Sequence, residues 1–282
     1  MAGDMHTHTT FSDGGLQIND LIVHAQNLNL DYLAITDHDT FLAYDYIDEN
    51  REKYKIHLIQ GVELSCMDTK RNRKVHILCY FPNKTTELQN YFKKINDSRN
   101  NKIQNNLEIL KKLYPCITDE KINAKKQDSK TWFKSHVMDI LVDYAYTDKL
   151  YGDLFKELFG RNGKCKTGHI DYLDIYDLLE IAHNSKGVVV MAHPSVYNSM
   201  ELVKELTDKK LLDGIEVYHP RNTLEDIKIL EQIVEKNNLL KTAGSDFHGR
   251  ISSKPVPLGS FTIENNLIEK LIKFSQEKHL AK

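Results

Sequence analysis

The stretch Tyr32-Leu33-Ala34-Ile35-Thr36-Asp37-His38-Asp39 decides the fold class, because an apolar run ends abruptly in acidic and histidine residues. Its first five residues have the length and apolar character of a buried strand. Similar short runs recur along the chain and alternate with segments whose apolar residues are spaced as on one face of a helix. Such alternation is typical of βαβ units around a parallel sheet. Because the ends of parallel strands meet at one edge, we expect the functional residues to gather there.

Seven strands are predicted from the apolar runs, and six helices from the helical spacing between them. The strands are Met5–His8, Tyr32–Thr36, Ile56–Gln60, Val75–Phe81, Gly187–Ala192, Gly214–Tyr218 and Leu240–Ala243. The helices are Leu16–Leu28, Phe41–Tyr54, Asp174–Asn184, Met200–Lys210, Thr223–Lys236 and Glu264–Lys278. Strands with intervening helices in a chain of this length favour a barrel over an open sheet. One strand departs from the rhythm: Val75–Phe81 follows Val62–Cys66 after a basic turn, which predicts an antiparallel hairpin.

Residues 87–173 interrupt this rhythm with helical patterns and carry no strand pattern. Helices are expected at Leu88–Tyr114, Lys130–Tyr144 and Lys149–Phe159, followed by a glycine-containing loop at 160–163. We interpret the stretch as a helical insertion between two barrel strands, within a single domain that spans residues 1–282. Insertions on the C-terminal face of a barrel commonly shape the substrate site, so we expect this one to lie over the active-site mouth.

The composition predicts a globular protein, with 282 residues, a formal net charge of −2, 40% hydrophobic residues and 28% charged residues. No apolar run approaches the ~18 residues of a membrane span, and the first residues lack an export signal, so we expect a cytoplasmic protein. The near-neutral charge argues against a strongly basic nucleic-acid surface. The four cysteines are far apart and form no C-x-x-C pair, so they indicate neither a disulfide framework nor a cysteine zinc site.

Histidine is frequent, with 13 residues, and many of them stand beside aspartate or at the expected strand ends. Because residues i and i+2 of a strand face the same side, His6 and His8 can bind one cation together. The strand-end motifs and the hairpin provide nine candidate ligands, which are His6, His8, Asp13, His38, Glu63, His76, His193, Asp246 and His248. Neutral imidazole and carboxylate suit Zn²⁺, Mn²⁺ or Fe²⁺. At about four or five ligands per cation, such a set suits two or three metals.

The order of these motifs resembles the PHP superfamily, the polymerase and histidinol phosphatase domains. The resemblance is carried by H-x-H at 6–8 with Asp13-Gly14, Thr36-Asp37-His38-Asp39, Gly61-Val62-Glu63, His76-Ile77-Leu78, Ala192-His193-Pro194 and Gly244-Ser245-Asp246-Phe247-His248-Gly249. It implies a distorted (β/α)7 barrel with two or three metals at its C-terminal mouth. It also implies one metal site of His6, His8, Glu63 and Asp246. A second site would add His76 and His193 to the bridging Glu63, and a third would consist of Asp13, His38 and His248.

Within the superfamily the chain resembles the small nucleotide phosphatases and 5′–3′ exonucleases, which carry a helical insertion between the H-I-L and A-H-P motifs. These relatives show an arginine early in the insertion, which Arg99 matches, and an R-x-H motif. Here Lys134-Ser135-His136 keeps the histidine and has lysine in place of the arginine, which retains the charge but loses bidentate phosphate geometry. The resemblance therefore implies that Arg99 and His136 hold phosphate, and Arg221 and His219 are further substrate candidates at the mouth.

We therefore expect a metal-dependent phosphoric ester hydrolase that cleaves phosphate monoesters. The expected substrates are nucleoside bisphosphates or 5′-phosphorylated oligonucleotides, and no membrane or stable protein partner is expected. A metal-activated hydroxide would attack phosphorus, Glu63 would bridge the metals, and His193 or Asp246 would protonate the leaving oxygen.

Three alternatives stay open. A histidinol-phosphate phosphatase shares the metal motifs but suits the insertion less well. An amidohydrolase barrel also opens with H-x-H, but it would place a bridging lysine where this chain has Glu63 and would leave Asp13, His38 and His248 without a role. A non-catalytic metal-binding module is the alternative outside the enzymes, although an intact ligand set argues against it.

Overall fold

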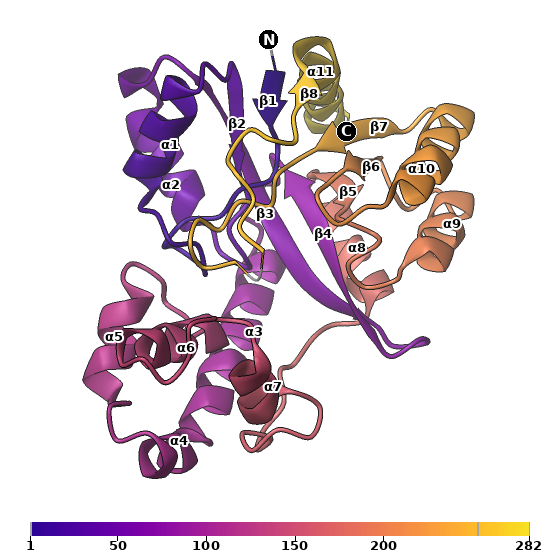
Figure 1. Ribbon diagram of the computed structural model, residues 1–282. Coiled ribbons are helices and arrows are strands. Elements are labelled where there is room, and N and C mark those ends of the chain that lie inside the picture. Colours follow the sequence, from indigo (N-terminus) through magenta and orange to yellow (C-terminus); the bar gives the residue numbers. More distant parts are fainter. Residues whose placement is uncertain (1, 253, 282) are drawn as a thin grey trace.

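A single mixed sheet forms the centre of the computed structural model, which describes residues 2–252 and 254–281 (Figure 1). The strands are β1 Ala2–Asp4, β2 Tyr32–Ile35, β3 His57–Asp68, β4 Arg73–Tyr80, β5 Val188–Met191, β6 Gly214–Tyr218, β7 Leu240–Ala243 and β8 Ile263–Glu264. They lie in the order β7-β6-β5-β4-β3-β2-β1-β8. The sheet curls until it nearly closes, which confirms the expected distorted α/β barrel.

The two sides of the sheet meet where the chain leaves β1 and β7. There the backbone N–H of Met5 donates to the carbonyl oxygen of Ala243 at 3.0 Å. The two segments approach so closely that a Cβ on Gly244 would lie 2.2 Å from the Cβ of His6. A residue without a side chain is therefore required beside the first histidine of the H-x-H motif.

β3 and β4 form the predicted antiparallel hairpin, and this hairpin distorts the barrel (Figure 1). Its register pairs Gly61 with Tyr80 at one end and Asp68 with Arg73 at the other. β4 is also antiparallel to β5, whereas β1–β2, β2–β3, β5–β6 and β6–β7 are parallel. Because antiparallel neighbours need no crossover helix, the chain passes from β3 to β4 through the short turn at residues 69–72.

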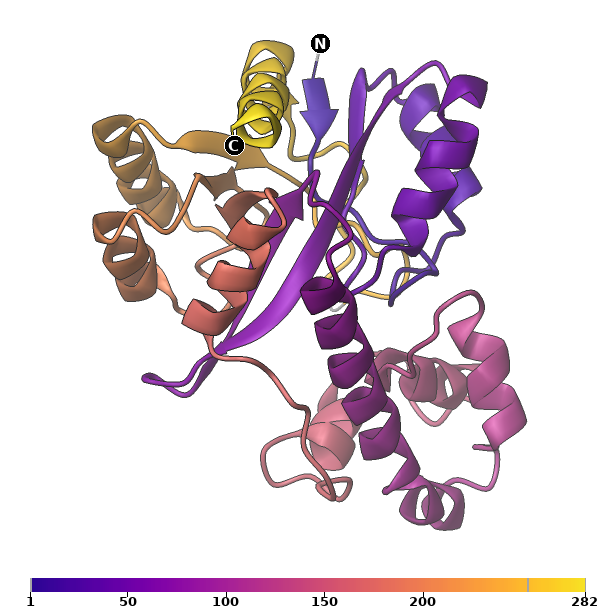
Figure 2. The same ribbon diagram turned by 180° about the vertical axis from the view of Figure 1, so that it is seen from behind.

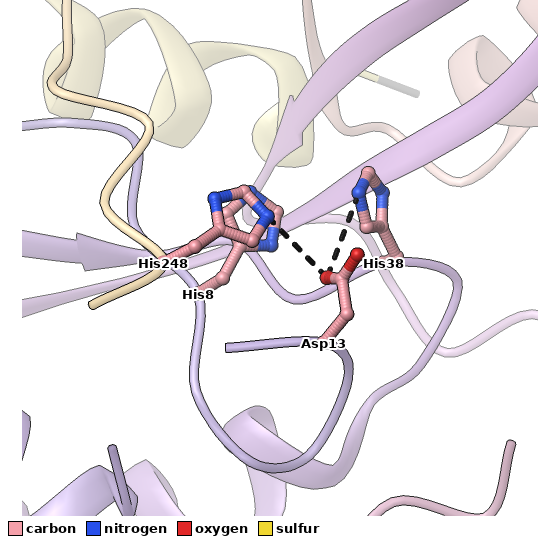
Figure 3. Close-up of side chains that lie close together, drawn as sticks. All are labelled: His8, Asp13, His38 and His248. Carbon is pink, nitrogen blue, oxygen red and sulfur yellow. Dashed lines mark ion pairs between the residues drawn. The ribbon is translucent and has the colours of Figure 1, made fainter. Parts of the chain in front are cut away.

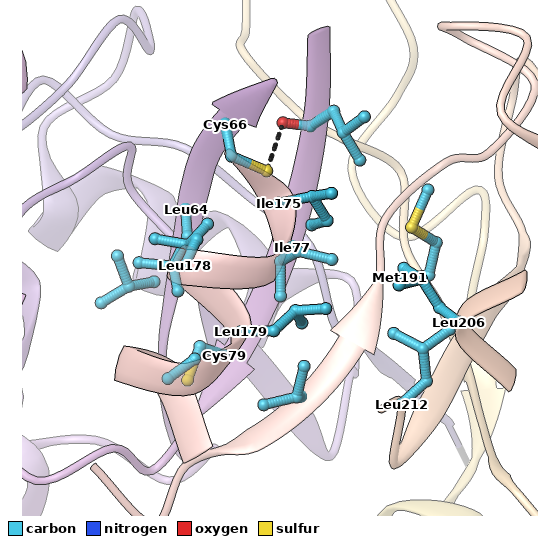
Figure 4. Packing of buried hydrophobic residues seen from close by; sticks show 14 of the residues in the cluster. Leu64, Cys66, Ile77, Cys79, Ile175, Leu178, Leu179, Met191, Leu206 and Leu212 are labelled. Carbon is cyan, nitrogen blue, oxygen red and sulfur yellow. Dashed lines mark hydrogen bonds between the residues drawn. The ribbon is translucent and has the colours of Figure 1, made fainter. Parts of the chain in front are cut away.

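Helices cover the outer face of the sheet and match the segments predicted from helical spacing. They are α1 Ile18–Asn27, α2 Leu42–Asn50 with the following 3-10 helix η1 Arg51–Lys53, α8 Ile175–Asn184, α9 Met200–Asp208, α10 Leu224–Asn237 and α11 Asn265–Leu280. Leu64 of β3, Ile77 of β4 and Leu179 of α8 are buried together in the largest core cluster (Figure 4). In the described part of the chain, no helix has the length and hydropathy of a membrane span.

The first strand lies earlier than the predicted Met5–His8, because side chains replace the regular ladder after Asp4. The backbone N–H of Thr7 donates to Oγ1 of Thr36 at 3.2 Å, and Oγ1 of Thr7 donates to the carbonyl oxygen of Ala34 at 2.7 Å. β8 was not predicted, because a strand of two residues has no recognisable alternation of apolar and polar residues. Its pairing partner β1 also lies far away in the sequence.

The insertion forms a helical lobe at the end of the barrel toward which β1 and β2 point (Figures 1 and 2). Its helices are α3 Thr86–Gln104, α4 Leu107–Leu113, α5 Asp119–Lys126, α6 Lys134–Asp143 and α7 Asp153–Phe159. Tyr91 and Ile95 in the first half of α3 pack into the barrel core, whereas the later helices share a smaller core of their own. α3 therefore anchors the lobe to the barrel.

The predicted helix Leu88–Tyr114 is broken into α3 and α4 by a side-chain contact. The amide nitrogen of Asn106 donates to the carbonyl oxygens of Lys102 and Thr167, both at 2.7 Å. Such local bonding competes with a continuous helix. α5 was missed because its sequence is mostly polar, with Ile122 as its buried residue.

Candidate metal centre and substrate cavities

His6 and His8 follow β1 and face Glu63 of β3 and Asp246, which follows β7. Nε2 of His6 lies 3.2 Å from Oε2 of Glu63, and Nε2 of His8 lies 3.1 Å from the same oxygen. Oδ1 of Asp246 is 3.5 Å from Nε2 of His6 and 3.2 Å from Nε2 of His8. These four side chains, the set implied for the first metal, bring one ligand atom each within 4.8 Å of one another.

Glu63 turns its other carboxylate oxygen toward a second group of histidines. Oε1 lies 2.7 Å from Nδ1 of His76 on β4 and 2.8 Å from Nε2 of His193, which follows β5. Nδ1 of His38 lies 3.2 Å from Oε2. His38, Glu63 and His76 have ligand atoms within 4.8 Å of one another. The structure thus brings the three residues of the implied second site together and adds His38 at its edge.

Asp13, His38, His248 and His8 form a third group (Figure 3). Oδ1 of Asp13 lies 3.4 Å from Nε2 of His248 and 3.8 Å from Nε2 of His38. The rings of His8 and His248 are stacked with centroids 4.0 Å apart. His8 therefore belongs to two groups, whereas the resemblance assigned it to the first alone.

Asp37 holds the loop that carries Asp13. Its Oδ1 accepts from the backbone N–H of Thr9 at 2.8 Å and from Oγ of Ser12 at 2.5 Å, and its Oδ2 accepts from Oγ1 of Thr9 at 2.6 Å. All of these groups are buried. The aspartate beside His38 thus fixes the position of another candidate ligand.

Several buried atoms of the three groups make no hydrogen bond. They are Nε2 of His6, Nδ1 and Nε2 of His8, Oδ1 of Asp13, Nδ1 of His38, Nδ1 of His193 and Oδ1 of Asp246. Buried polar atoms are costly to leave unpaired, and converging lone pairs are satisfied by a cation. Because the donors are imidazoles and carboxylates without a thiolate, the residues fit the implied divalent transition metals.

Electrostatics keep the carboxylates of the centre ionised. Burial alone would raise the pKa of Glu63, but His76, His38 and His6 outweigh it and hold this pKa well below its usual range. Burial lowers the pKa of His38 to about 3, so its imidazole is neutral and the lone pair of one ring nitrogen is available. Burial opposes protonation of His248, yet Asp13 and Asp246 raise its pKa to about 10. A cation bound by His248 would displace this proton, so metal binding there should release a proton.

His219 and Arg221, two of the predicted substrate residues, lie beside the first group. Nε2 of His219 is 3.5 Å from Oδ2 of Asp246, and its Nδ1 accepts from the backbone N–H of Arg221 at 3.1 Å. Both residues line a cavity of about 370 Å³, whose walls also include His76, His193, Asp246 and His248. This cavity opens directly onto the candidate metal centre.

Arg99 and His136, the other two predicted substrate residues, are largely buried, with 7% and 5% of their surfaces exposed. The guanidinium of Arg99 donates to Oδ2 of Asp39 at 2.6 Å and to Oγ of Ser65 at 2.8 Å. Nδ1 of His136 accepts from the backbone N–H of Phe133 at 3.2 Å and so caps α6. Both side chains are engaged within the protein, and their contact with phosphate stays a prediction.

Glu216 of β6 is a site residue that the sequence analysis missed. Its buried carboxylate accepts from Nδ1 of His6 at 2.9 Å and from the backbone N–H of His193 at 2.8 Å. An ionised carboxylate can only accept, so Nδ1 of His6 carries the proton and Nε2 presents its lone pair toward Glu63. The sequence did contain one indication of this role, because Glu216 is a charged residue inside the otherwise apolar strand Gly214–Tyr218.

The comparisons with known proteins agree with this geometry. Residues 4–253 match the family model of the PHP domain, and the chain belongs to this family. It is a metal-dependent phosphoric ester hydrolase.

Three relatives cover nearly the same span. A phosphoribosyl 1,2-cyclic phosphate 1,2-diphosphodiesterase from Eggerthella lenta is 29% identical over 258 residues, or 90% of this chain and 97% of that protein. A 5′–3′ exoribonuclease from Escherichia coli is 29% identical over 254 residues, or 87% of this chain and 84% of that protein. A solved structure from Bifidobacterium adolescentis, described as a metal-dependent phosphoesterase, has a TM-score of 0.86 at 27% identity and covers 96% of both chains.

We predict that Glu216→Gln weakens metal retention while the fold stays intact. The amide keeps the size of the side chain but removes the charge that orients and polarises His6, and losses of this kind are typically about 10- to 100-fold in metal affinity. Titration of the loaded protein with a chelator measures the effect. Glu235→Gln, an exposed change on α10, is the matched control. Equal metal retention in both variants would refute the role of Glu216.

Proposed function

We propose that the chain hydrolyses phosphate monoesters at a centre of two or three divalent cations. We further propose that nucleoside bisphosphates or 5′-phosphorylated oligonucleotides are its substrates. The observation that carries the proposal is the position of Glu63, whose two oxygens lie within 3.2 Å of five imidazoles. A carboxylate surrounded by five other potential ligands suits two or more adjacent cations better than it suits one cation.

The proposed ligands fall into three sets around Glu63. The first set is His6, His8, Glu63 and Asp246, the second is Glu63, His76 and His193, and the third is Asp13, His38 and His248. Zn²⁺, Mn²⁺ and Fe²⁺ all suit these donors. Divalent cations held there supply an acidified water and positive charge for the phosphoryl oxygens.

The residues of the chain orient the reacting groups. Glu63 lies between the ligand sets, because each of its two carboxylate oxygens faces different histidines. Glu216 fixes His6 through Nδ1, and this leaves Nε2 directed toward Glu63. His193 and Asp246 line the cavity beside the centre, so they border the phosphate that reacts there. These contacts support catalytic roles for Glu63, His193 and Asp246.

The substrate class follows from the surroundings of the centre and from the relatives. The names of two relatives specify an RNA chain and a phosphoribosyl cyclic phosphate, and both compounds carry more than one phosphate. In this chain, Arg221, His219 and Lys254 line the cavity beside Asp246 and can contact the substrate there. Arg99 and His136 stay proposed phosphate contacts, and in the structure Arg99 also joins α3 to Asp39 and His136 caps α6.

The metal content follows from the convergence of nine ligand side chains. Elemental analysis of protein purified without chelator should give two or three transition-metal equivalents per chain. Removal of the metal should lower the melting temperature, because cations bound only by the folded state stabilise it. At most one equivalent, with no gain on reconstitution, would contradict this stoichiometry.

The substrate proposal predicts a defined order of preference. Nucleoside bisphosphates and 5′-phosphorylated oligonucleotides should be hydrolysed with higher kcat/KM than p-nitrophenyl phosphate, because the cavities offer contacts beyond the reacting phosphate. Release of inorganic phosphate across such a panel measures the order. Histidinol phosphate belongs in the panel, and a preference for it would replace the proposed substrate class.

Glu63→Gln should abolish activity and leave the fold largely unchanged. An amide offsets repulsion between neighbouring cations poorly, and loss of the centre should lower kcat by about 10³-fold or more. Glu180→Gln, an exposed change of the same chemistry on α8, should keep the wild-type rate. If the Glu63 variant retains more than about a tenth of the activity, the bridging role is wrong.

A further inference from the structure

A second cavity of about 340 Å³ lies between the metal centre and the insertion. It shares Asp13, His38 and His76 with the candidate ligand groups. The hairpin strand β4, α3 and the start of α6 form part of the remaining wall and contribute Lys74, Lys102 and Lys134. We call this space the lysine pocket.

The three lysines of the lysine pocket gather positive charge opposite Asp13, and none of them is paired with an acid among the described residues. In the described part of the chain, no carboxylate lies within ion-pair distance of any of their ammonium groups. Nζ of Lys102 donates to the carbonyl oxygen of Gly168 at 3.1 Å. Burial, together with the nearby Lys74 and Lys102, lowers the pKa of Lys134 to about 8. An anion that binds between such like charges lowers the repulsion between them.

Two of the three ammonium groups, those of Lys74 and Lys134, lie near aromatic rings. Nζ of Lys74 lies 5.3 Å from the ring centroid of Tyr172, and Nζ of Lys134 lies 5.5 Å from that of Phe159 and 5.9 Å from that of Phe155. Cation–π contacts hold the side chains in place but leave their N–H groups able to donate to a ligand.

The start of α6 adds to the positive potential. α6 has ten residues, and its first turn contains no acidic side chain. Lys134 and Ser135 of that turn line the lysine pocket. The first N–H groups of a helix lack intrahelical partners and carry the positive end of its dipole. Arg99 also lines this space, but its guanidinium is bound to Asp39.

We propose that the lysine pocket binds a second phosphate group of the substrate, through Lys74, Lys102 and Lys134, while the reacting phosphate lies at the Glu63 centre. The inference rests on the proposed function, because it places the reacting phosphate at that centre. It assigns the selection of doubly phosphorylated substrates to lysines from the hairpin and from two insertion helices. Charge-assisted contacts of this kind change transition-state binding by about tenfold or more each.

The test compares two substrates in four lysine-pocket variants and one control variant of the metal-loaded enzyme. Lys74→Met, Lys102→Met and Lys134→Met should each lower kcat/KM for adenosine 3′,5′-bisphosphate by about tenfold and change that for p-nitrophenyl phosphate less than about twofold. Lys134→Arg should restore most of the activity, since it keeps the charge. Lys112→Met, an exposed change on α4, is the matched control and should behave as wild type.

A binding measurement separates this inference from the proposed function. Calorimetric titration of chelator-treated protein with adenosine 3′,5′-bisphosphate should show weaker binding to the variant with all three lysines changed than to wild type. If wild type hydrolyses neither substrate, the proposed function fails, and this titration still decides the inference. Equal losses on both substrates in the lysine variants, or unchanged binding in the titration, would overturn the lysine pocket.

Discussion

A buried carboxylate surrounded by imidazoles is the interaction on which the rest of the centre depends. Glu63 is 1% exposed, and burial alone would favour its neutral form. The neighbouring histidines keep it ionised, and the carboxylate in turn draws their ring nitrogens to one point. Removing either partner of such an arrangement leaves an uncompensated buried charge or an unsatisfied lone pair. The barrel therefore has to bring strands from distant parts of the sequence to this point with little error in the position of their side chains.

The antiparallel hairpin explains how one strand contributes a ligand from its middle. The register of β3 and β4 places Glu63 opposite Leu78 and Ser65 opposite His76. Glu63 and His76 are therefore diagonal neighbours on one face of the hairpin, a separation that long side chains span. The other histidines of the centre follow parallel strands, at their C-terminal ends. The irregular hairpin thus adds a ligand at a place where a regular βα unit would have a loop.

The fold and the candidate ligands could be predicted because their sequence patterns are local. A strand followed by H-x-H or Asp-His places those side chains at the mouth of a barrel, whatever the distant partners are. The environment of Arg99 could not be predicted in this way, because its partner Asp39 lies in another element, 60 residues away. The break between α3 and α4 depends in the same way on Thr167. The lysine pocket combines β4, α3 and α6, and only tertiary packing brings these elements together.

Arg99 attaches the insertion to the barrel. Its partner Asp39 is the residue after the candidate ligand His38, so the ion pair joins α3 to the rim of the metal centre. Arg250, two residues after His248, makes a second link by donating to both oxygens of Asp139 on α6. Loss of one partner from a buried pair costs about 3–5 kcal/mol, so replacing Arg99 would disturb the lobe as well as any phosphate it contacts.

These two links also tie the lysine pocket to the centre. The first runs from α3, which carries Lys102, to the residue beside His38, and the second runs from α6, which carries Lys134, to the loop of His248. A movement of the lobe would therefore shift two of the three lysines and disturb two candidate ligands together. The distance between the two phosphate positions is then set by the packing of the insertion against the barrel. Selectivity for a substrate of matching length follows from that packing, in addition to the charge of the lysines.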